Sequence, residues 1–417
     1  MKLQFLVPAG LLLVSCFAHA GNPPLETLTD AKQVVVSYDN ACALKNNGSV
    51  WCWGYDSASH NYAVPVEVVS GAISLAAGGT HTCALRNDGS VQCWGSNSFG
   101  QLGDGHIGGS STTPVFVHGP VYTGDDHLTG ALSIAVGDEH TCALLSIGRM
   151  VCWGKNNYGQ LGDGTTTTQS WPVYALLPAF ATGIAAGNEH SCAILSTNAM
   201  QCWGHNEHGQ LGDSGPEPYS LPVYVKLAGG EVPALAKAND YDNTCVVLYS
   251  RTLKCWGLNE YGELGNSADD DGSDMPHSTP KTVLISATPI QPLYPVSDVA
   301  VGFVHACAKM DDGLGNTNIQ CWGDNRWGQL GDGGNEDHSD LPVAVLAYGN
   351  ASTPLTGILS IAAAGFTTCA VLNDGTVQCW GDNSSGQLGN GFSGDLSAPI
   401  FPVKQAVDDI FKNGFNN

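Results

Sequence analysis

Residues 78–95 read GGTHTCALRNDGSVQCWG, and this stretch decides the fold because the chain repeats it. Every copy contains a first cysteine, a short turn, and a second cysteine followed by Trp-Gly. The cysteine pairs are Cys42/Cys52, Cys83/Cys93, Cys142/Cys152, Cys192/Cys202, Cys245/Cys255, Cys307/Cys321 and Cys369/Cys379. The Trp residues of successive copies are 41 to 66 residues apart, a spacing typical of a four-stranded propeller blade. The sequence therefore predicts an all-β fold, a seven-bladed β-propeller.

The turn between the two cysteines predicts a disulfide across each hairpin. Asn87-Asp88-Gly89 is typical of a three-residue hairpin loop with glycine at the left-handed position. Counting outward from Asp88 pairs Arg86 with Ser90 and Cys83 with Cys93. The cysteines then form a non-hydrogen-bonded pair, whose Cα atoms are about 4.5 Å apart. That separation lies within the disulfide range of about 4.4–6.8 Å, so we expect one cross-strand disulfide per blade.

Two copies depart from this turn. Asn198 can replace the glycine because it tolerates positive φ, but Arg251 stands at the same position in another copy. The Cys307/Cys321 copy carries four extra residues in its turn. In all copies, strand alternation places the disulfide on one face of the hairpin and the Trp on the other. We expect the seven Trp side chains to form the core between neighbouring blades.

A zinc site is the alternative use of these cysteines. His81, His140, His190 and His305 each precede a first cysteine by two residues. The chain contains no Cys-x-x-Cys knuckle, and paired cysteines of an exported chain usually form disulfides. We predict no structural metal and no cofactor. Residues 267–272 are only a weak match to a calcium loop, because a first-position Asp and a twelfth-position Glu are missing.

The N-terminal residues 1–20 are typical of an export signal, with Lys2, an apolar run and then small residues. Cleavage after Ala20 would release a soluble protein. Cleavage before Cys16, at a lipobox, would leave a lipid anchor instead, and both readings stay open. Residues 21–33 are predicted to be a short linker, 34–403 the propeller, and 404–417 a tail without assigned structure.

The charge of the chain limits its partners. The formal net charge is −23 and the isoelectric point is about 4.6. Such a field opposes binding to nucleic acid and to anionic membrane surfaces. We therefore expect no nucleic-acid partner, and membrane contact only through a possible lipid anchor at Cys16.

The repeat resembles that of the regulator of chromosome condensation family. The resemblance rests on residues 78–85, on Trp-Gly after the second cysteine, and on residues 97–103, NSFGQLG. It covers nearly the whole chain after the export signal, except that residues 55–61 replace the Gly-Gln-Leu-Gly loop of the first copy. The cysteine pairs are similar to those of an exported bacterial, alpha-tubulin-suppressor-like branch. Nuclear members act on a Ran-type GTPase and bind nucleosomes, but export, acidity and disulfides argue against both roles here.

Two sets of residues are candidate sites. The first is the position before Gly-Gln-Leu-Gly, here called the slot, which varies between copies while staying mostly aromatic. Its residues are Phe99, Tyr158, His208, Tyr261, Trp327 and Ser385. A variable aromatic set on one propeller face suits a binding platform, although each ring could simply pack on its own loop. The second set is His81, His140, His190 and His305, which could do acid–base work or hold their turns by backbone hydrogen bonds.

The fold does not transfer a function, so two classes of function remain. The favoured class is an exported, non-catalytic scaffold that presents one propeller face to a protein or glycan partner outside the cytoplasm, in the periplasm, at the cell surface or in the medium. The alternative is a propeller enzyme, such as a lyase or a glycan-active protein, that uses axial His and carboxylate groups.

Overall fold

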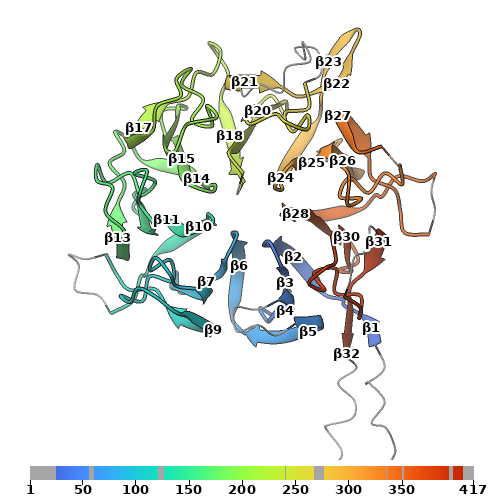
Figure 1. Ribbon diagram of the computed structural model, residues 1–417, viewed down its shortest axis with the longest axis horizontal. Helices are drawn as coiled ribbons and strands as arrows, with labels where there is room; N and C mark the ends of the chain where they lie inside the picture. Colours follow the sequence, from blue (N-terminus) through green and yellow to red (C-terminus); the bar gives the residue numbers. More distant parts are fainter. Residues whose placement is uncertain are drawn as a thin grey trace, which may run out of the picture.

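A computed structural model describes residues 25–55, 61–120, 126–239, 241–266, 277–334, 336–349, 352–393 and 398–406. Seven four-stranded antiparallel sheets are arranged around a central channel, as the sequence predicted (Figure 1). The predicted export signal and its alternative cleavage sites lie outside the described residues. None of the described segments forms a helix that could span a membrane.

Each blade uses four strands that are consecutive in the chain. Blades 1 to 4 comprise β2 (Ala31–Val36), β3 (Asn40–Lys45), β4 (Val50–Tyr55) and β5 (Asn61–Val69); β6 (Ala72–Ala77), β7 (His81–Arg86), β8 (Val91–Ser96) and β9 (Ser110–Phe116); β10 (Ala131–Val136), β11 (His140–Leu145), β12 (Met150–Gly154) and β13 (Gln169–Tyr174); β14 (Ala181–Ala186), β15 (His190–Leu195), β16 (Met200–Gly204) and β17 (Tyr219–Tyr224). Blades 5 to 7 comprise β18 (Pro233–Ala238), β19 (Asn243–Leu248), β20 (Leu253–Gly257) and β21 (His277–Thr282); β24 (Val296–Val301), β25 (His305–Asp311), β26 (Thr317–Asp324) and β27 (His338–Ala344); β28 (Ile358–Ala364), β29 (Thr367–Leu372), β30 (Val377–Gly381) and β31 (Ala398–Pro402).

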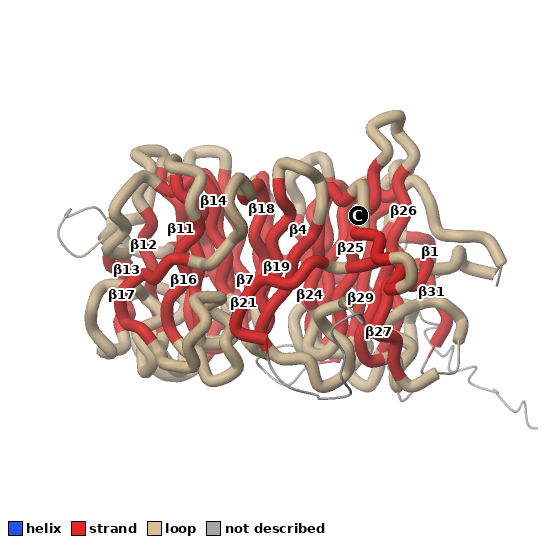
Figure 2. The backbone as a smooth tube through the Cα atoms, turned by 90° about the horizontal axis from the view of Figure 1, so that it is seen from above, coloured by secondary structure: helices blue, strands red, loops and turns tan. Residues whose placement is uncertain are grey.

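The first strand of every blade is the innermost, and these strands line a channel of about 230 Å³. Loops gather at the two ends of the strands (Figure 2). One end carries the turn between the first and second strands and the Gly-Gln-Leu-Gly loop between the third and fourth strands of each blade. We call this end the GQLG face. The opposite face carries the Cys-to-Cys hairpins and the connections between blades.

The disulfide prediction is confirmed in every blade. All seven bonds form, with Cα–Cα distances of 4.0–4.1 Å. They join Cys42 to Cys52, Cys83 to Cys93, Cys142 to Cys152, Cys192 to Cys202, Cys245 to Cys255, Cys307 to Cys321, and Cys369 to Cys379. These Cα atoms lie slightly closer than the 4.5 Å expected for such a pair. The pairing itself is the one that the spacing of the cysteines predicted.

The hairpin geometry explains why these cysteines meet. The register pairs Cys83 with Cys93, and the N–H of Arg86 donates to the carbonyl of Ser90 at 2.9 Å. Arg251 adopts a φ of 65° and so completes its hairpin without glycine. The four extra residues of the sixth hairpin lengthen β25 and β26, which stay paired as far as Asp311 and Thr317. Cys307 and Cys321 therefore remain directly opposite each other despite the longer turn.

The core lies between blades, and the Trp prediction is confirmed. Six of the seven Trp side chains are 0–1% exposed, and Trp94 is 8% exposed. Trp203 of blade 4, for example, packs with Cys142, Met150 and Cys152 of blade 3. A disulfide face of one blade thus meets the Trp face of the next. Both faces of each sheet are buried in this way, which explains why apolar residues occupy both parities of the strands.

The ring closes without exchanging a strand between the first and last blades. A separate two-stranded sheet joins β1 (Leu25–Thr27) to β32 (Lys404–Ala406), and the N–H of Leu28 donates to the carbonyl of Val403 at 2.8 Å. These strands lie in the segments that the sequence analysis treated as linker and tail. A further small sheet, β22 (Leu284–Ala287) with β23 (Ile290–Pro292), lies between blades 5 and 6.

Candidate functional site

The loop between the third and fourth strands has the same internal bonding in blades 2 to 7. In blade 3 the N–H of Leu161 donates to Oδ1 of Asn156 at 3.0 Å, and the N–H of Tyr158 donates to Oε1 of Gln160 at 3.0 Å. Both bonds recur in the other five loops, with Glu263 in place of glutamine in blade 5. The slot residue bonds its loop through the backbone, so the loop leaves its side chain free to vary.

Each slot side chain instead contacts the next blade on the GQLG face. The slot residues are half-buried, except Tyr158, which is 38% exposed. The contacts are Phe99 with the Lys155 ammonium, Tyr158 with the His205 ring, His208 with Asp242, Tyr261 with the Arg326 guanidinium, Trp327 with Phe366, and Ser385 with Asp39. The slot therefore forms a ring of contacts between blades, and one edge of each side chain stays accessible.

The four predicted histidines do not reach the surface. Their side chains are 0–2% exposed, and each Nε2 lies 2.6–2.8 Å from a hydroxyl group of the next blade. Burial lowers the pKa of His140 from 6.5 to about 3, with smaller contributions from neighbouring charges. The sequence analysis allowed for a bond to the backbone of the same turn, whereas the bond in the structure joins two blades. The imidazoles are neutral links between blades.

An aromatic cluster that the sequence analysis missed spans the mouth of the channel on the GQLG face. Tyr241 stacks on Phe303 with ring centroids 4.0 Å apart, and Phe303 lies 5.6 Å from Phe366 and 6.1 Å from Tyr38. Blades 1 and 6 are not neighbours, so the contact of Tyr38 with Phe303 crosses the mouth. Phe366 also meets the slot residue Trp327 at 6.4 Å. We call these five residues the axial aromatic cluster; all are half-buried.

The other half of the GQLG face is ionic. Nζ of Lys155 lies 2.6 Å from Glu139 and 2.8 Å from Glu189. Burial alone would lower the pKa of Lys155, but its hydrogen bonds to both carboxylates raise that pKa to about 12. Burial, together with the nearby Glu139, raises the pKa of Asp138 to about 6. The face thus has an aromatic half on blades 5, 6, 7 and 1 and a charged half on blades 3 and 4.

A common signal marks both halves. Apart from Trp327 and Lys155, which follow the third strand, these aromatic and charged residues occupy the turn between the first and second strands. There Tyr38, Asp138, Tyr241 and Phe303 are equivalent in position, and Phe366 lies one residue further along its turn. The residues of this turn vary from copy to copy, as the slot residue does. A comparison of the copies at this turn would therefore have pointed to the aromatic and charged residues found there.

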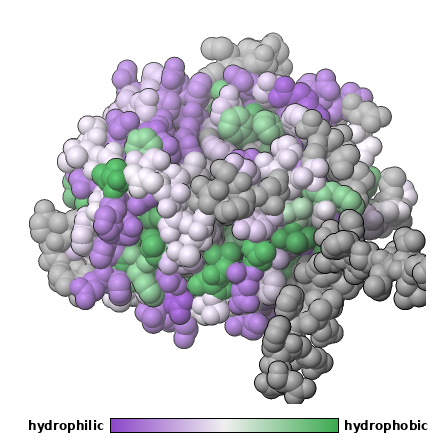
Figure 3. Space-filling view, turned by 60° about the horizontal axis from the view of Figure 1, so that its bottom comes forward, coloured by the Kyte–Doolittle hydropathy of each residue, from purple (hydrophilic) through white to green (hydrophobic). Residues whose placement is uncertain are grey.

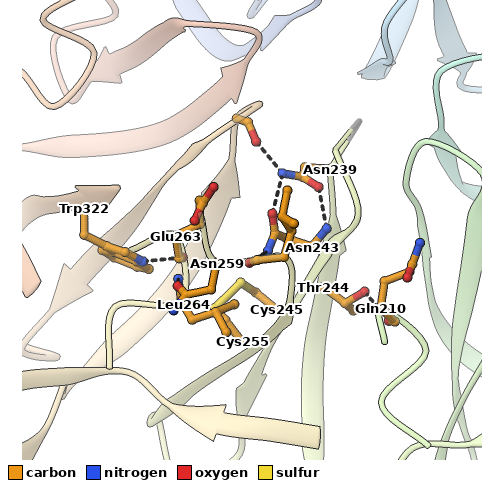
Figure 4. Close-up of a disulfide and its surroundings, with 12 residues drawn as sticks. Gln210, Asn239, Asn243, Thr244, Cys245, Cys255, Asn259, Glu263, Leu264 and Trp322 are labelled. Carbon is orange, nitrogen blue, oxygen red and sulfur yellow. Dashed lines mark hydrogen bonds between the residues drawn. A yellow bond between two sulfur atoms is a disulfide. The ribbon is translucent and has the colours of Figure 1, made fainter. Parts of the chain in front are cut away.

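Among the described residues, no group of three or more His, Cys, Asp or Glu side chains is placed to hold a metal ion. The weak calcium-loop match, residues 267–272, lies outside the described part of the chain. Figure 4 shows the two cysteines of blade 5, whose sulfur atoms are bonded to each other as a disulfide. In this blade Asn243 stands at the position where four other blades have histidine.

Comparison with known proteins identifies the repeat. Models of the regulator of chromosome condensation (RCC1) repeat match residues 31–59, 72–101, 132–160, 181–210 and 358–387, and a second model of this repeat matches 88–144 and 148–194. RCC1 repeats therefore occur in blades 1 to 4 and in blade 7 of this chain.

Two curated relatives place these repeats in context. The chain is 29% identical over 312 residues to the ultraviolet-B receptor UVR8 of Arabidopsis thaliana, covering 74% of this chain and 64% of that protein. It is 28% identical over 304 residues to the human E3 ubiquitin-protein ligase HERC2, covering 72% of this chain and 5% of that protein. The chain therefore spans less than two thirds of the length of either relative.

Two solved structures have the same fold. Human WBSCR16 is similar, with a TM-score of 0.68, 21% identity, and coverage of 82% of this chain and 84% of that one. Prp20p from Saccharomyces cerevisiae has a TM-score of 0.65, 21% identity and 80% coverage of both chains. These relatives are eukaryotic, so a bacterial, exported branch remains a prediction.

Proposed function

We propose that this RCC1-repeat propeller is an exported, non-catalytic scaffold that holds a partner protein on its GQLG face. The aromatic rings of this face, in the slot and in the axial aromatic cluster, carry this proposal. Half-buried aromatic rings give large contact area at low conformational cost and often anchor protein interfaces. The solved structure of Prp20p is described together with its binding to Gsp1p and histones, which supports protein binding as the use of such a propeller.

Two observations support the compartment and the absence of catalysis. Seven disulfides are typical of proteins that fold in an oxidising compartment. The four imidazoles proposed for acid–base work are sealed between blades, where no substrate can touch them. A propeller enzyme would have to use other groups, such as His205 with Asp242, whose nearest atoms are 3.7 Å apart.

The test compares two triple variants of the mature chain as bait in the envelope fraction or culture medium of its native source. Replacing Tyr158, Tyr261 and Trp327 with Ser should reduce binding of the captured protein by about 2 kcal/mol or more, the scale of an interface hot spot. Folding should survive, because Ser385 already occupies the slot in blade 7. The matched control replaces Phe180, Tyr249 and Leu314 with Ser; these are 65%, 73% and 86% exposed on the opposite face.

Equal capture by the slot variant and the wild type would contradict the proposed face. Capture that survives protease treatment of the bound material but not periodate oxidation would support a glycan partner instead.

A further inference from the structure

The Gln of each Gly-Gln-Leu-Gly loop holds the next blade by its backbone carbonyl. The indole N–H of Trp153 donates to the carbonyl of Gln101 at 2.9 Å, and the hydroxyl of Thr141 donates to the same oxygen at 3.0 Å. The Trp bond recurs at six of the seven blade interfaces, at 2.7–2.9 Å. Four of these interfaces also have the hydroxyl bond. Figure 4 shows two such contacts, from Trp322 to the Glu263 loop and from Thr244 to Gln210.

The residues after this Gln complete the contact. Leu102, Leu161, Leu211, Leu264, Leu330 and Leu388 are each 0–1% exposed between the disulfide of their own blade and the Trp of the next. The backbone of the glycine that follows approaches that Trp so closely that no side chain would fit between them. A Cβ on Gly162, for example, would be 2.5 Å from Nε1 of Trp203. The contact therefore requires a carbonyl, a leucine-like side chain and a glycine in sequence.

The interface between blades 1 and 2 has the receiving groups, but blade 1 lacks the Gly-Gln-Leu-Gly sequence that provides the acceptor carbonyl at the other interfaces. Blade 2 supplies Trp94 and Thr82, the counterparts of Trp153 and Thr141. Neither the Trp94 indole nor the Thr82 hydroxyl has a hydrogen-bond partner among the described residues, whereas their counterparts in blade 3 are both bonded to Gln101. Residues 56–60, which join β4 to β5 in blade 1, lie outside the described residues.

A cleft of about 690 Å³ lies between the two blades and is lined by Cys52, Tyr55, Thr82 and Trp94, among others. Cys52 is partly exposed, although the other thirteen bridge cysteines are 0–1% exposed. Figure 3 brings forward the rim that carries β5 and β9, the outer strands of these blades, and shows a mixture of polar and apolar residues there.

We propose that this cleft receives a loop of a partner protein that places a main-chain carbonyl on Trp94 and Thr82 and a leucine against the Cys42–Cys52 bridge. The partner loop takes the position that Gly-Gln-Leu-Gly occupies at the other six interfaces. This inference does not rest on the proposed function of the axial aromatic cluster, because the cleft uses different donors.

The probe is a synthetic peptide with the sequence of residues 155–164, KNNYGQLGDG, added to the disulfide-bonded chain with ¹⁵N-labelled Trp. The indole signal of Trp94, assigned by its loss in Trp94→Phe, should shift on titration while those of Trp53, Trp153 and Trp203 do not. Before peptide is added, the Trp94 indole proton should exchange with water faster than these three. Thr82→Val should weaken peptide binding by about 5-fold, because it removes the hydroxyl that donates to the peptide carbonyl.

Three controls make the result specific. Peptides carrying Leu161→Asp or Gly162→Ala should bind at least ~10-fold more weakly, because they lose the apolar anchor or clash with the indole. Thr141→Val makes the same change at an interface that is already filled, and it should leave peptide affinity unchanged.

Slow exchange of the Trp94 indole in the free protein would show that the chain fills its own cleft and would overturn the proposal. Equal binding of the Leu161→Asp peptide, or unchanged affinity in Thr82→Val, would do the same. A shift of the Trp94 signal with chitohexaose but not with the peptide would assign the cleft to a glycan instead.

Discussion

The indole N–H of Trp53 in the first blade donates a 2.7 Å hydrogen bond to the backbone carbonyl of Gln387 in the last blade. These residues are 334 positions apart in sequence, yet the contact is the same as that between any two successive blades from blade 2 onward. The ring therefore closes by the ordinary interface of the repeat, without a strand exchanged between its ends. The contact also shows why the loop of one blade matters for the stability of the next.

Truncation of a repeat Trp should destabilise the ring. Trp203 is fully buried against blade 3, so Trp203→Ala should lower the free energy of unfolding by about 3–5 kcal/mol, as for other large core aromatics. Trp203→Phe should cost more than Trp94→Phe by about 0.5–1.5 kcal/mol, because only the former loses a buried hydrogen bond, from its indole to the carbonyl of Gln160, which keeps the Ser191 hydroxyl as its other donor. Denaturant unfolding of the three variants measures both differences, and equal stability of the two Phe variants would refute the bonding argument.

The seven disulfides should differ in accessibility. Thiol titration of the denatured, unreduced mature protein should find almost no free thiol. Under native conditions, limited reduction followed by alkylation and mass spectrometry should label Cys42 and Cys52 first, because thiol–disulfide exchange requires access to a sulfur and Cys52 is the bridge cysteine that is partly exposed. First labelling at a bridge whose two cysteines are 0% exposed, such as Cys369 with Cys379, would contradict this order.

The architecture could be predicted from the sequence because its determinants are local. The register of each hairpin follows from a glycine such as Gly89 lying between Cys83 and Cys93, and the blade count follows from the repeats. Even Arg251 fits, since a single residue in the left-handed region costs little compared with a buried hairpin. The missing loop of the first copy was also visible as a sequence difference.

The site could be predicted only in part. The slot was visible as a variable position, but its contacts join different blades and needed the curvature of the ring. Tyr38 and Phe303 meet across the channel mouth although they are distant in sequence, and nothing local signals that contact. The role of His140 was equally hidden, because its hydroxyl partner, Ser191, belongs to the next blade.

Glu263 should make the protein less stable as pH rises. It replaces the Gln of the loop in blade 5, is 2% exposed, and its Oε1 has no hydrogen-bond partner among the described residues. Burial raises the pKa of Glu263 from 4.5 to about 7, so the fold favours the protonated carboxyl. Stability is therefore lost between about pH 4.5 and 7, as the carboxyl ionises more readily in the unfolded chain.

Glu263→Gln should remove that loss. The variant should be more stable than the wild type at pH 8 by up to about 3 kcal/mol, the equivalent of the shift in pKa, and equally stable at pH 4. Urea unfolding at both pH values measures the difference. Glu217→Gln, at an exposed position in the corresponding loop of blade 4, is the matched control and should show little pH dependence of its effect; a constant difference between wild type and Glu263→Gln at all pH values would contradict the account.

His140 should contribute to unfolding in acid. The hydroxyl of Ser191 donates to the carbonyl of Gln160 at 2.8 Å, so it must accept its second bond from an N–H at Nε2 of His140. Burial lowers the pKa of His140 from 6.5 to about 3, which means that the folded imidazole is neutral at about pH 5 while the unfolded one is charged. The unfolded chain then binds one more proton at this position. The stability that the neutral imidazole provides is therefore lost as pH falls below 6.5.

His140→Gln removes the extra proton that the unfolded chain binds at this position. The free energy of unfolding should then fall less steeply between pH 6 and pH 4, by about 1.4 kcal/mol per pH unit. Its control is His106→Gln, since the His106 side chain is 81% exposed and its removal should leave the slope unchanged. Parallel slopes for the wild type and His140→Gln would mean that this imidazole carries a charge in the folded ring or is open to water, and the link between blades 3 and 4 would then have to be reassigned.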